Sequence, residues 1–289
     1  MTMLEYLTDN QGLAYLIIIL FGLIIGSFYN VAIHRIPLML FREWHQQCQE
    51  FLAENPTPPQ LPPRFNLFVP RSHCPGCQQL IPGWHNIPLL SYLILQGRCA
   101  KCKTRIPCRY PLVELLSAAS MVFMVWHFGF NYQGLAAIIF AGFLIILSFI
   151  DFDHQLLPDQ LNLLLLWIGL VANCFTLFVD PTSAILGATI GYSGLWLFAH
   201  GYSLLTKKEG MGFGDLKLLA ALGAWLGWQQ LPFIILFASF SGAVVGIILI
   251  ACKKQTRNKP IPFGPYLALA GLVAMTYGQA ITNYYLSQW

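Results

Sequence analysis

The chain has 289 residues, of which 56% are hydrophobic and only 10% are charged, and its mean hydropathy is +0.60. Soluble domains carry about 25% charged residues, so this composition excludes an ordinary water-soluble fold. The net charge of +4 is not accompanied by any nucleic-acid-binding motif, and we expect no nucleic-acid partner. We expect an all-α polytopic membrane protein with membrane lipid around it.

Eight apolar segments follow one another along the chain, so we predict about eight transmembrane helices. The first, residues 13–33, is long enough to cross about 30 Å of hydrocarbon as a helix. Glu5 and Asp9 precede it without any Lys or Arg, which favours a retained helix over a signal peptide. The segment 216–228 is short for a full crossing and is either a re-entrant or a tilted piece. The other six segments are 112–128, 135–150, 161–179, 184–205, 232–251 and 266–285.

One long polar stretch interrupts this pattern and is rich in Pro, Gln, Arg and Cys. It divides the chain into an N-terminal transmembrane helix at 1–33, an extramembrane domain at 34–110 and a membrane core at 111–289. The fold class that follows is a helical membrane protein with one small loop domain between its first and second helices.

The basic residues predict which side of the membrane this domain faces. All 16 Lys and Arg residues lie in three clusters, at 35–109, 207–217 and 253–259. These clusters follow the first, fifth and seventh apolar segments, so eight crossings place all three on one side. Basic loops stay in the cytoplasm. We therefore expect an inner-membrane protein with a cytoplasmic 34–110 domain.

Carboxylates at a membrane face are costly, so the few acidic residues in or beside the apolar segments are candidates for function. Asp151, Asp153 and Asp159 lie at the predicted cytoplasmic end of the third segment, and Asp215 lies at the cytoplasmic start of the sixth. Two carboxylates within hydrogen-bonding reach share a proton, which lets one act as general base and the other as general acid. Peptide hydrolysis requires both a general base for water and a general acid for the leaving amine.

Each acid also has a structural interpretation. Asp159 follows Pro158 and precedes an apolar run, which is typical of a helix N-cap, while Asp153 is interpreted as a solvated loop acid. Asp151 abuts apolar residues and is therefore the catalytic candidate of the group. The glycines before Asp215 either admit a substrate backbone or are turn and packing glycines, and Gly-x-Gly-Asp alone is a weak motif.

Four of the eight cysteines form two C-x₂-C pairs, separated by 21 residues. Paired knuckles of this kind are typical of a tetrahedral zinc site, and disulfides are disfavoured in the reducing cytosol. Four thiolates close the coordination shell, so the zinc is predicted to be structural. Cys108 is a possible substitute ligand, and His73 is interpreted as a loop side chain. The predicted ligands are Cys74, Cys77, Cys99 and Cys102.

Together these motifs identify a resemblance. The sequence resembles the prepilin peptidase family, the bacterial type IV leader peptidases, along essentially its whole length. The matching motifs are GSFYNVAIHRIP at 26–37, the two knuckles, YPLVE at 110–114, residues 150–159 and Gly-Phe-Gly-Asp at 212–215. The resemblance implies that Asp151 and Asp215 are the catalytic pair of a Gly-x-Gly-Asp membrane aspartic protease, with 111–289 as its protease core.

The resemblance also implies a substrate and a second activity. Family members cut the basic leader from type IV prepilins and type II secretion pseudopilins. They then methylate the new N-terminal amine with S-adenosylmethionine. The family ties methylation to the cytoplasmic loop, which makes Gly97 a candidate for binding the methyl donor, with Glu114 as a second. Glu114 is equally well interpreted as a buried structural acid paired with a loop Arg.

Two other classes of function are open to the same residues. An ion- or proton-coupled transporter also places acids near glycine-broken helices, but it predicts matching halves, which are not evident here. A zinc-stabilised assembly factor without catalysis is the third hypothesis, and it would be favoured if either aspartate proved dispensable.

Overall fold

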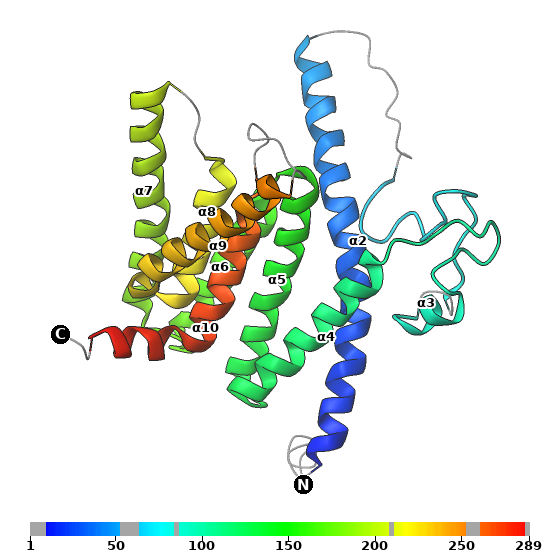
Figure 1. The fold of residues 1–289 in the computed structure, drawn as a ribbon, viewed down its shortest axis with the longest axis horizontal. Coiled ribbons are helices and arrows are strands. Elements are labelled where there is room, and N and C mark those ends of the chain that lie inside the picture. The colour runs from blue at the N-terminus through cyan, green and yellow to red at the C-terminus, as the bar shows by residue number, and fades with distance from the viewer. Residues whose placement is uncertain (1–9, 53–63, 84–86, 208–210, 253–260, 287–289) are drawn as a thin grey trace. The chain divides into compact units, whose positions relative to one another are not determined.

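The computed structural model describes residues 10–52, 64–83, 87–207, 211–252 and 261–286 (Figure 1). Within these ranges the secondary structure is helical, with two isolated β-bridges and no strand. The chain forms two compact units, Met1–Phe130 and Asn131–Trp289.

The first unit contains a helix much longer than the apolar segment that predicted it. Helix α2 runs from Gln11 to Leu52 and contains Pro37, whereas we predicted a helix ending at residue 33. Its 42 residues span about 63 Å, twice the hydrocarbon thickness, so part of it lies outside the bilayer. The predicted apolar segment lies inside α2, and the helix continues beyond it because polar residues extend it. The other helices are α3, Leu90–Ile94, and α4, Arg109–Phe128.

Helices α2 and α4 pack through small residues. A Cβ added to Gly22 would lie 2.6 Å from the Ala118 Cα, and one added to Gly26 would lie 2.6 Å from the Glu114 Cα. The spacing of these two glycines is GxxxG, which lets helix backbones approach closely in membranes. Larger side chains at either position would separate the two helices.

The second unit is built around α8, Phe213–Leu226. Every residue from Leu218 to Leu226 is buried, and α8 packs against both α6 and α7. A Cβ added to Gly187 of α7 would lie 2.2 Å from the Gly223 carbonyl oxygen of α8. Protein therefore surrounds this short helix, which explains how 14 residues suffice for it in a membrane. The remaining elements are α5 Tyr132–His154, α6 Asp159–Cys174, α7 Pro181–Thr206, η2 Trp228–Gln230, α9 Leu231–Ala251 and α10 Gly264–Leu286.

The structure places a helix at each of the eight predicted apolar segments. Five of the described helices are long and apolar enough to cross a bilayer, and α6 is a shorter apolar helix. The chain is thus a helical membrane protein, while the count of eight crossings stays a prediction, as do the predicted domain bounds. The third basic cluster, 253–259, and Lys208 of the second lie outside the described residues.

Candidate functional site

Asp151 lies in the last turn of α5, whose end is set by Gln155 in the left-handed conformation. Only 5% of its surface is exposed. Its Oδ2 accepts a hydrogen bond of 2.9 Å from the backbone N–H of Gly264, the first residue of α10. Positive charge at a helix N-terminus stabilises an anion there. The start of α10 therefore orients this carboxylate and favours its ionised form.

Asp215 lies in the first turn of α8, directly after the Gly212-Phe-Gly turn. The preceding carbonyl, that of Gly214, accepts a 3.3 Å hydrogen bond from the Asn162 side-chain amide of α6. Asp215 also interacts electrostatically with Asp151. The two acids, 64 positions apart in sequence, thus act on each other across α5 and α8.

The Leu157 side chain lies next to glycines that flank both acids. A Cβ added to Gly214 would lie 2.7 Å from the Leu157 Cβ, and one added to Gly264 would lie 3.1 Å from its Cδ2. The Gly264 Cβ would also lie 2.7 Å from the Asp151 Oδ2. A larger residue at either glycine would therefore collide with Leu157 or Asp151.

The other two acids of the first group have different surroundings. Asp153 is exposed, as expected for a loop acid, although it lies within α5. Asp159 pairs with Lys217 at 2.6 Å. The N-cap of α6 is Pro158, without a side-chain cap, so the prediction of Asp159 as N-cap was wrong by one position. Proline supplies no capping oxygen, and Asp159 instead joins α6 to α8.

Sequence reasoning missed two residues of this site. Gly264 contributes a backbone N–H, which leaves no chemical signature in the sequence, and Asn162 lies within an apolar run. The sequence signal for Asn162 was that burying an amide inside a membrane helix costs free energy. Such an amide therefore requires a hydrogen-bonding partner. The Asn162 Oδ1 is buried without a hydrogen-bond partner among the described residues.

The four predicted cysteines come together in the first unit. Their sulfur atoms all lie within 4.8 Å of one another, and the Cys74 and Cys102 sulfurs are 3.6 Å apart. Four sulfurs at 2.3 Å from a tetrahedral zinc lie about 3.8 Å apart, so the spacing fits a metal ion of this kind.

The two knuckles have the same backbone, repeated after 25 residues. The Cys74 N–H donates to the Gln79 carbonyl and the Cys99 N–H to the Thr104 carbonyl, each at 2.9 Å. The residue after each second cysteine, Gln78 or Lys103, has a positive φ. This shared turn aims the sulfurs of each pair in one direction.

Hydrogen bonding prepares some of these thiols to bind a cation. Hydrogen bonds from the Thr104 side chain and backbone lower the pKa of Cys102 to about 6. At Cys77 a hydrogen bond from the Gln79 backbone lowers the pKa, but burial and the neighbouring thiols raise it to about 11. All four thiols ionise together only beside a cation, because like charges this close repel. Neither Cys108 nor His73 belongs to the cluster, and His73 bonds the Arg71 carbonyl instead.

The protein-family matches cover the residues of both candidate sites. Residues 20–128 match the bacterial peptidase A24 N-terminal domain, and residues 138–247 match the type IV leader peptidase family. The chain belongs to the type IV leader peptidase family. The first match contains the cysteine cluster and the second contains Asp151 and Asp215.

Curated relatives of this family match along the full chain. A prepilin leader peptidase/N-methyltransferase of Stutzerimonas stutzeri is 49% identical over 286 residues, covering 99% of this chain and 98% of the relative. Proteins of the same name from Pseudomonas aeruginosa and Aeromonas salmonicida are 48% and 49% identical, with the same coverage of both chains. No solved structure matches the chain significantly.

Gly97 and Glu114, the two residues predicted to bind the methyl donor, both contact other parts of the chain. Gly97 has a φ of +65°, and a Cβ there would lie 2.8 Å from the Tyr92 hydroxyl. The Glu114 Oε2 accepts a 2.9 Å hydrogen bond from the Leu89 N–H, and its carboxyl also bonds the Ser27 side chain. Glu114 is thus buried, as expected, but its described partners are this N–H and hydroxyl in place of the predicted Arg. Both residues thus contact the segment between Leu89 and Tyr92.

Proposed function

We propose that this chain removes the leader peptide of prepilins at the cytoplasmic face of the inner membrane and then methylates the new N-terminus. Its family and its relatives' names support both activities. The observation that carries the proposal is the pairing of two acids from separate helices, the buried Asp151 and the half-buried Asp215, with Gly264 and Gly212 close to their carboxylates.

In the proposed reaction one carboxylate takes a proton from water while the water oxygen attacks the scissile carbonyl carbon. The other, protonated, carboxyl donates its proton to the substrate, the C–N bond breaks, and the amine leaves with a proton. Asp151 is assigned the base, because the Gly264 N–H bond and the α10 N-terminus favour its ionised form. Asp215 is then the acid.

The proposed substrates are type IV prepilins and, by the family resemblance, type II secretion pseudopilins. Such a substrate keeps a basic leader in the cytosol and an apolar helix in the bilayer, so its scissile bond lies at the cytoplasmic boundary. The distribution of Lys and Arg supports a cytoplasmic position for the 34–110 domain and for both acids.

The metal of the cysteine cluster is proposed to be zinc with a structural role. Four thiolates complete a tetrahedral shell and leave no open position for a reacting water. Zinc would hold the two knuckles, which have almost no secondary structure of their own, in one arrangement.

S-adenosylmethionine is the proposed methyl donor, and when bound it supplies an electrophilic methyl group to the new amine. Gly97 and Glu114 remain predictions for this activity. Their contacts with Tyr92 and Leu89 favour a role in positioning the loop, since both are already engaged in holding it. The transporter alternative has no support from the family or from the relatives.

Co-expression of the chain with a prepilin tests the proposal, because the mass of the mature product reports cleavage and methylation together. We expect a product that has lost its leader and gained one methyl group. Asp151→Asn or Asp215→Asn should leave the prepilin uncut while the enzyme still inserts. Normal cleavage by either variant would refute the assignment of the acids.

A further inference from the structure

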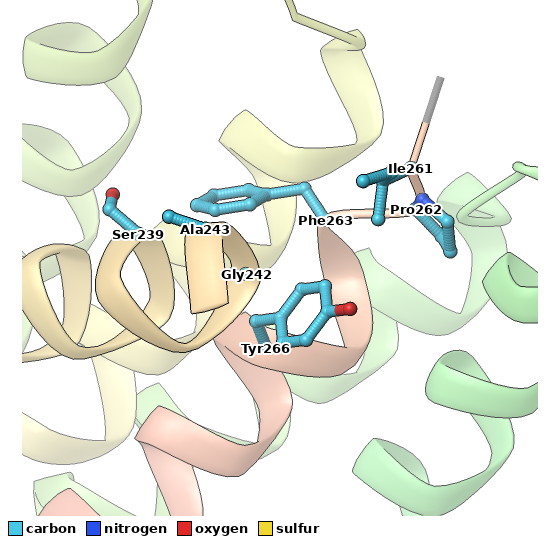
Figure 2. A pocket seen from close by; sticks show the side chains of 7 residues that line it. All are labelled: Ser239, Gly242, Ala243, Ile261, Pro262, Phe263 and Tyr266. Carbon is cyan, nitrogen blue, oxygen red and sulfur yellow. The ribbon is translucent and has the colours of Figure 1, made fainter. Parts of the chain in front are cut away.

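Two adjoining hollows, which we call the α7–α9 groove, open beside the candidate catalytic pair. Their volumes are about 280 and 270 Å³, and Ser239 and Phe263 line both. Figure 2 shows the first hollow, with the rings of Phe263 and Tyr266 reaching toward the Gly242 turn of α9. The second adds Gly194 and Phe198 of α7. The described lining is apolar apart from the Ser239 hydroxyl and the Tyr266 ring tip.

The helices on either side of this groove pack onto different partners. Helix α7 packs chiefly on α8, and α9 packs chiefly on α10. Tyr266 and Leu267, near the start of α10, line the two hollows between them. Small residues at Gly194, Ser239 and Gly242 leave room there for another apolar chain to approach closely.

Chain neighbours of both acids line the groove. Phe263 directly precedes Gly264, whose N–H binds Asp151, and Met211 precedes the Gly212–Asp215 turn. Of these two, Phe263 borders both hollows and Met211 borders the second. An apolar segment lying in the groove would thus begin beside the reacting carboxylates.

We propose that the α7–α9 groove binds the apolar segment of the prepilin that adjoins the scissile bond, and so sets which substrates are cut efficiently. This inference rests on the proposed function, which supplies a substrate with an apolar helix next to the cleavage point. The apolar helix of such a substrate suits the groove. Leaving lipid gives apolar side chains little free energy, whereas close packing against small residues stabilises the bound helix.

Gly194 and Gly201 provide a matched test. They lie on α7 seven residues apart, and a Cβ at either meets nothing within 4 Å, so both positions are open to an added side chain. Only Gly194 lines the groove. We expect Gly194→Phe to raise the KM for prepilin cleavage by about tenfold, with a smaller effect on kcat. Gly201→Phe should stay near wild type.

Equal KM values for the two Phe variants would overturn the groove assignment. Thermal melting of each purified variant checks folding, and Ser239→Trp fills the groove from the opposite wall if Gly194→Phe fails to fold. A photo-crosslinker at Phe198 should capture the apolar segment of the prepilin, whereas one at Leu205 should not. If wild type does not cut prepilin at all, the proposed function itself fails, which is a separate outcome.

Discussion

The cysteine-containing segment and the α8-centred unit are stabilised in different ways. The described residues between Ser72 and Ile106, without 84–86, include the five-residue helix α3 and few buried side chains, and paired turns around four sulfurs order them. Helix α8 is buried along nearly its whole length and contacts its neighbours through glycines. On the proposed function the first would depend on a metal ion and the second on helix packing, so the two should fail independently.

The loop at Asn66 and Leu67, outside the knuckles, is likewise held by hydrogen bonds from a single side chain. The Arg35 guanidinium of α2 is buried and donates hydrogen bonds of 2.8 and 3.2 Å to the carbonyls of Asn66 and Leu67. Residues 64–70 include no buried side chain, so a charged side chain orders this stretch in place of apolar packing. Such regions are the first to open when a single partner is removed.

Removing one knuckle cysteine should have the largest effect on the first region. Cys99→Ser is expected to lose the bound zinc and expose the 72–106 segment to protease, since structural zinc supplies most of the folding free energy of such sites. Metal analysis and limited proteolysis measure both effects. Cys108→Ser, which removes an exposed cysteine outside the cluster, is the control. Full zinc content in Cys99→Ser would contradict the four-cysteine site.

In the α8-centred unit, adding one methyl group at Gly264 should have the largest effect. Gly264→Ala places a Cβ 2.7 Å from the Asp151 Oδ2, which displaces the carboxylate and weakens its backbone hydrogen bond. We expect kcat for cleavage to fall about a hundredfold, while zinc content stays normal. Gly201→Ala, at a position with open space, should retain wild-type cleavage. A Gly264→Ala enzyme with normal kcat would remove α10 from the site.

Two buried asparagines on α6 separate catalytic from structural effects. Asn162 donates to the carbonyl before Asp215, whereas Asn173 donates to the carbonyls of Ala224 and Trp225 at the other end of α8. Asn162→Ala should lower kcat about tenfold with little change in KM. Asn173→Ala should instead lower the melting temperature. Kinetics and melting curves that showed the same pattern for both variants would argue against a positioning role for Asn162.

The smallest predicted effect concerns methylation. Gly97→Ala introduces a Cβ 2.8 Å from the Tyr92 hydroxyl at a positive φ, so it should reduce methylation several-fold while cleavage continues. Adding Tyr92→Ala should restore part of the loss by removing the clash. Product masses from co-expression measure both. No recovery in the double variant would indicate that Gly97 acts by a route other than Tyr92.

A hydrophobic run predicted the place of each of eight helices in the described chain, because burial in lipid requires an apolar helix. They did not predict the length of α2, whose outer part is polar. The C-x₂-C spacing predicted the sulfur cluster, since two short turns fix its geometry locally. The contact between Gly264 and Asp151 was unpredictable, because it joins a backbone amide to a carboxylate 113 positions away. Such long-range contacts depend on helix packing.

The most direct measurement compares kcat/KM for prepilin cleavage by Asp151→Asn, Asp215→Asn and the double variant. Two groups that share one proton act as a unit, so each single variant should lose at least about a thousandfold and the double variant should be no worse. Metal content and melting temperature should match wild type in all three. Near-normal cleavage by either single variant, or losses that multiply in the double variant, would contradict a paired site at α5 and α8.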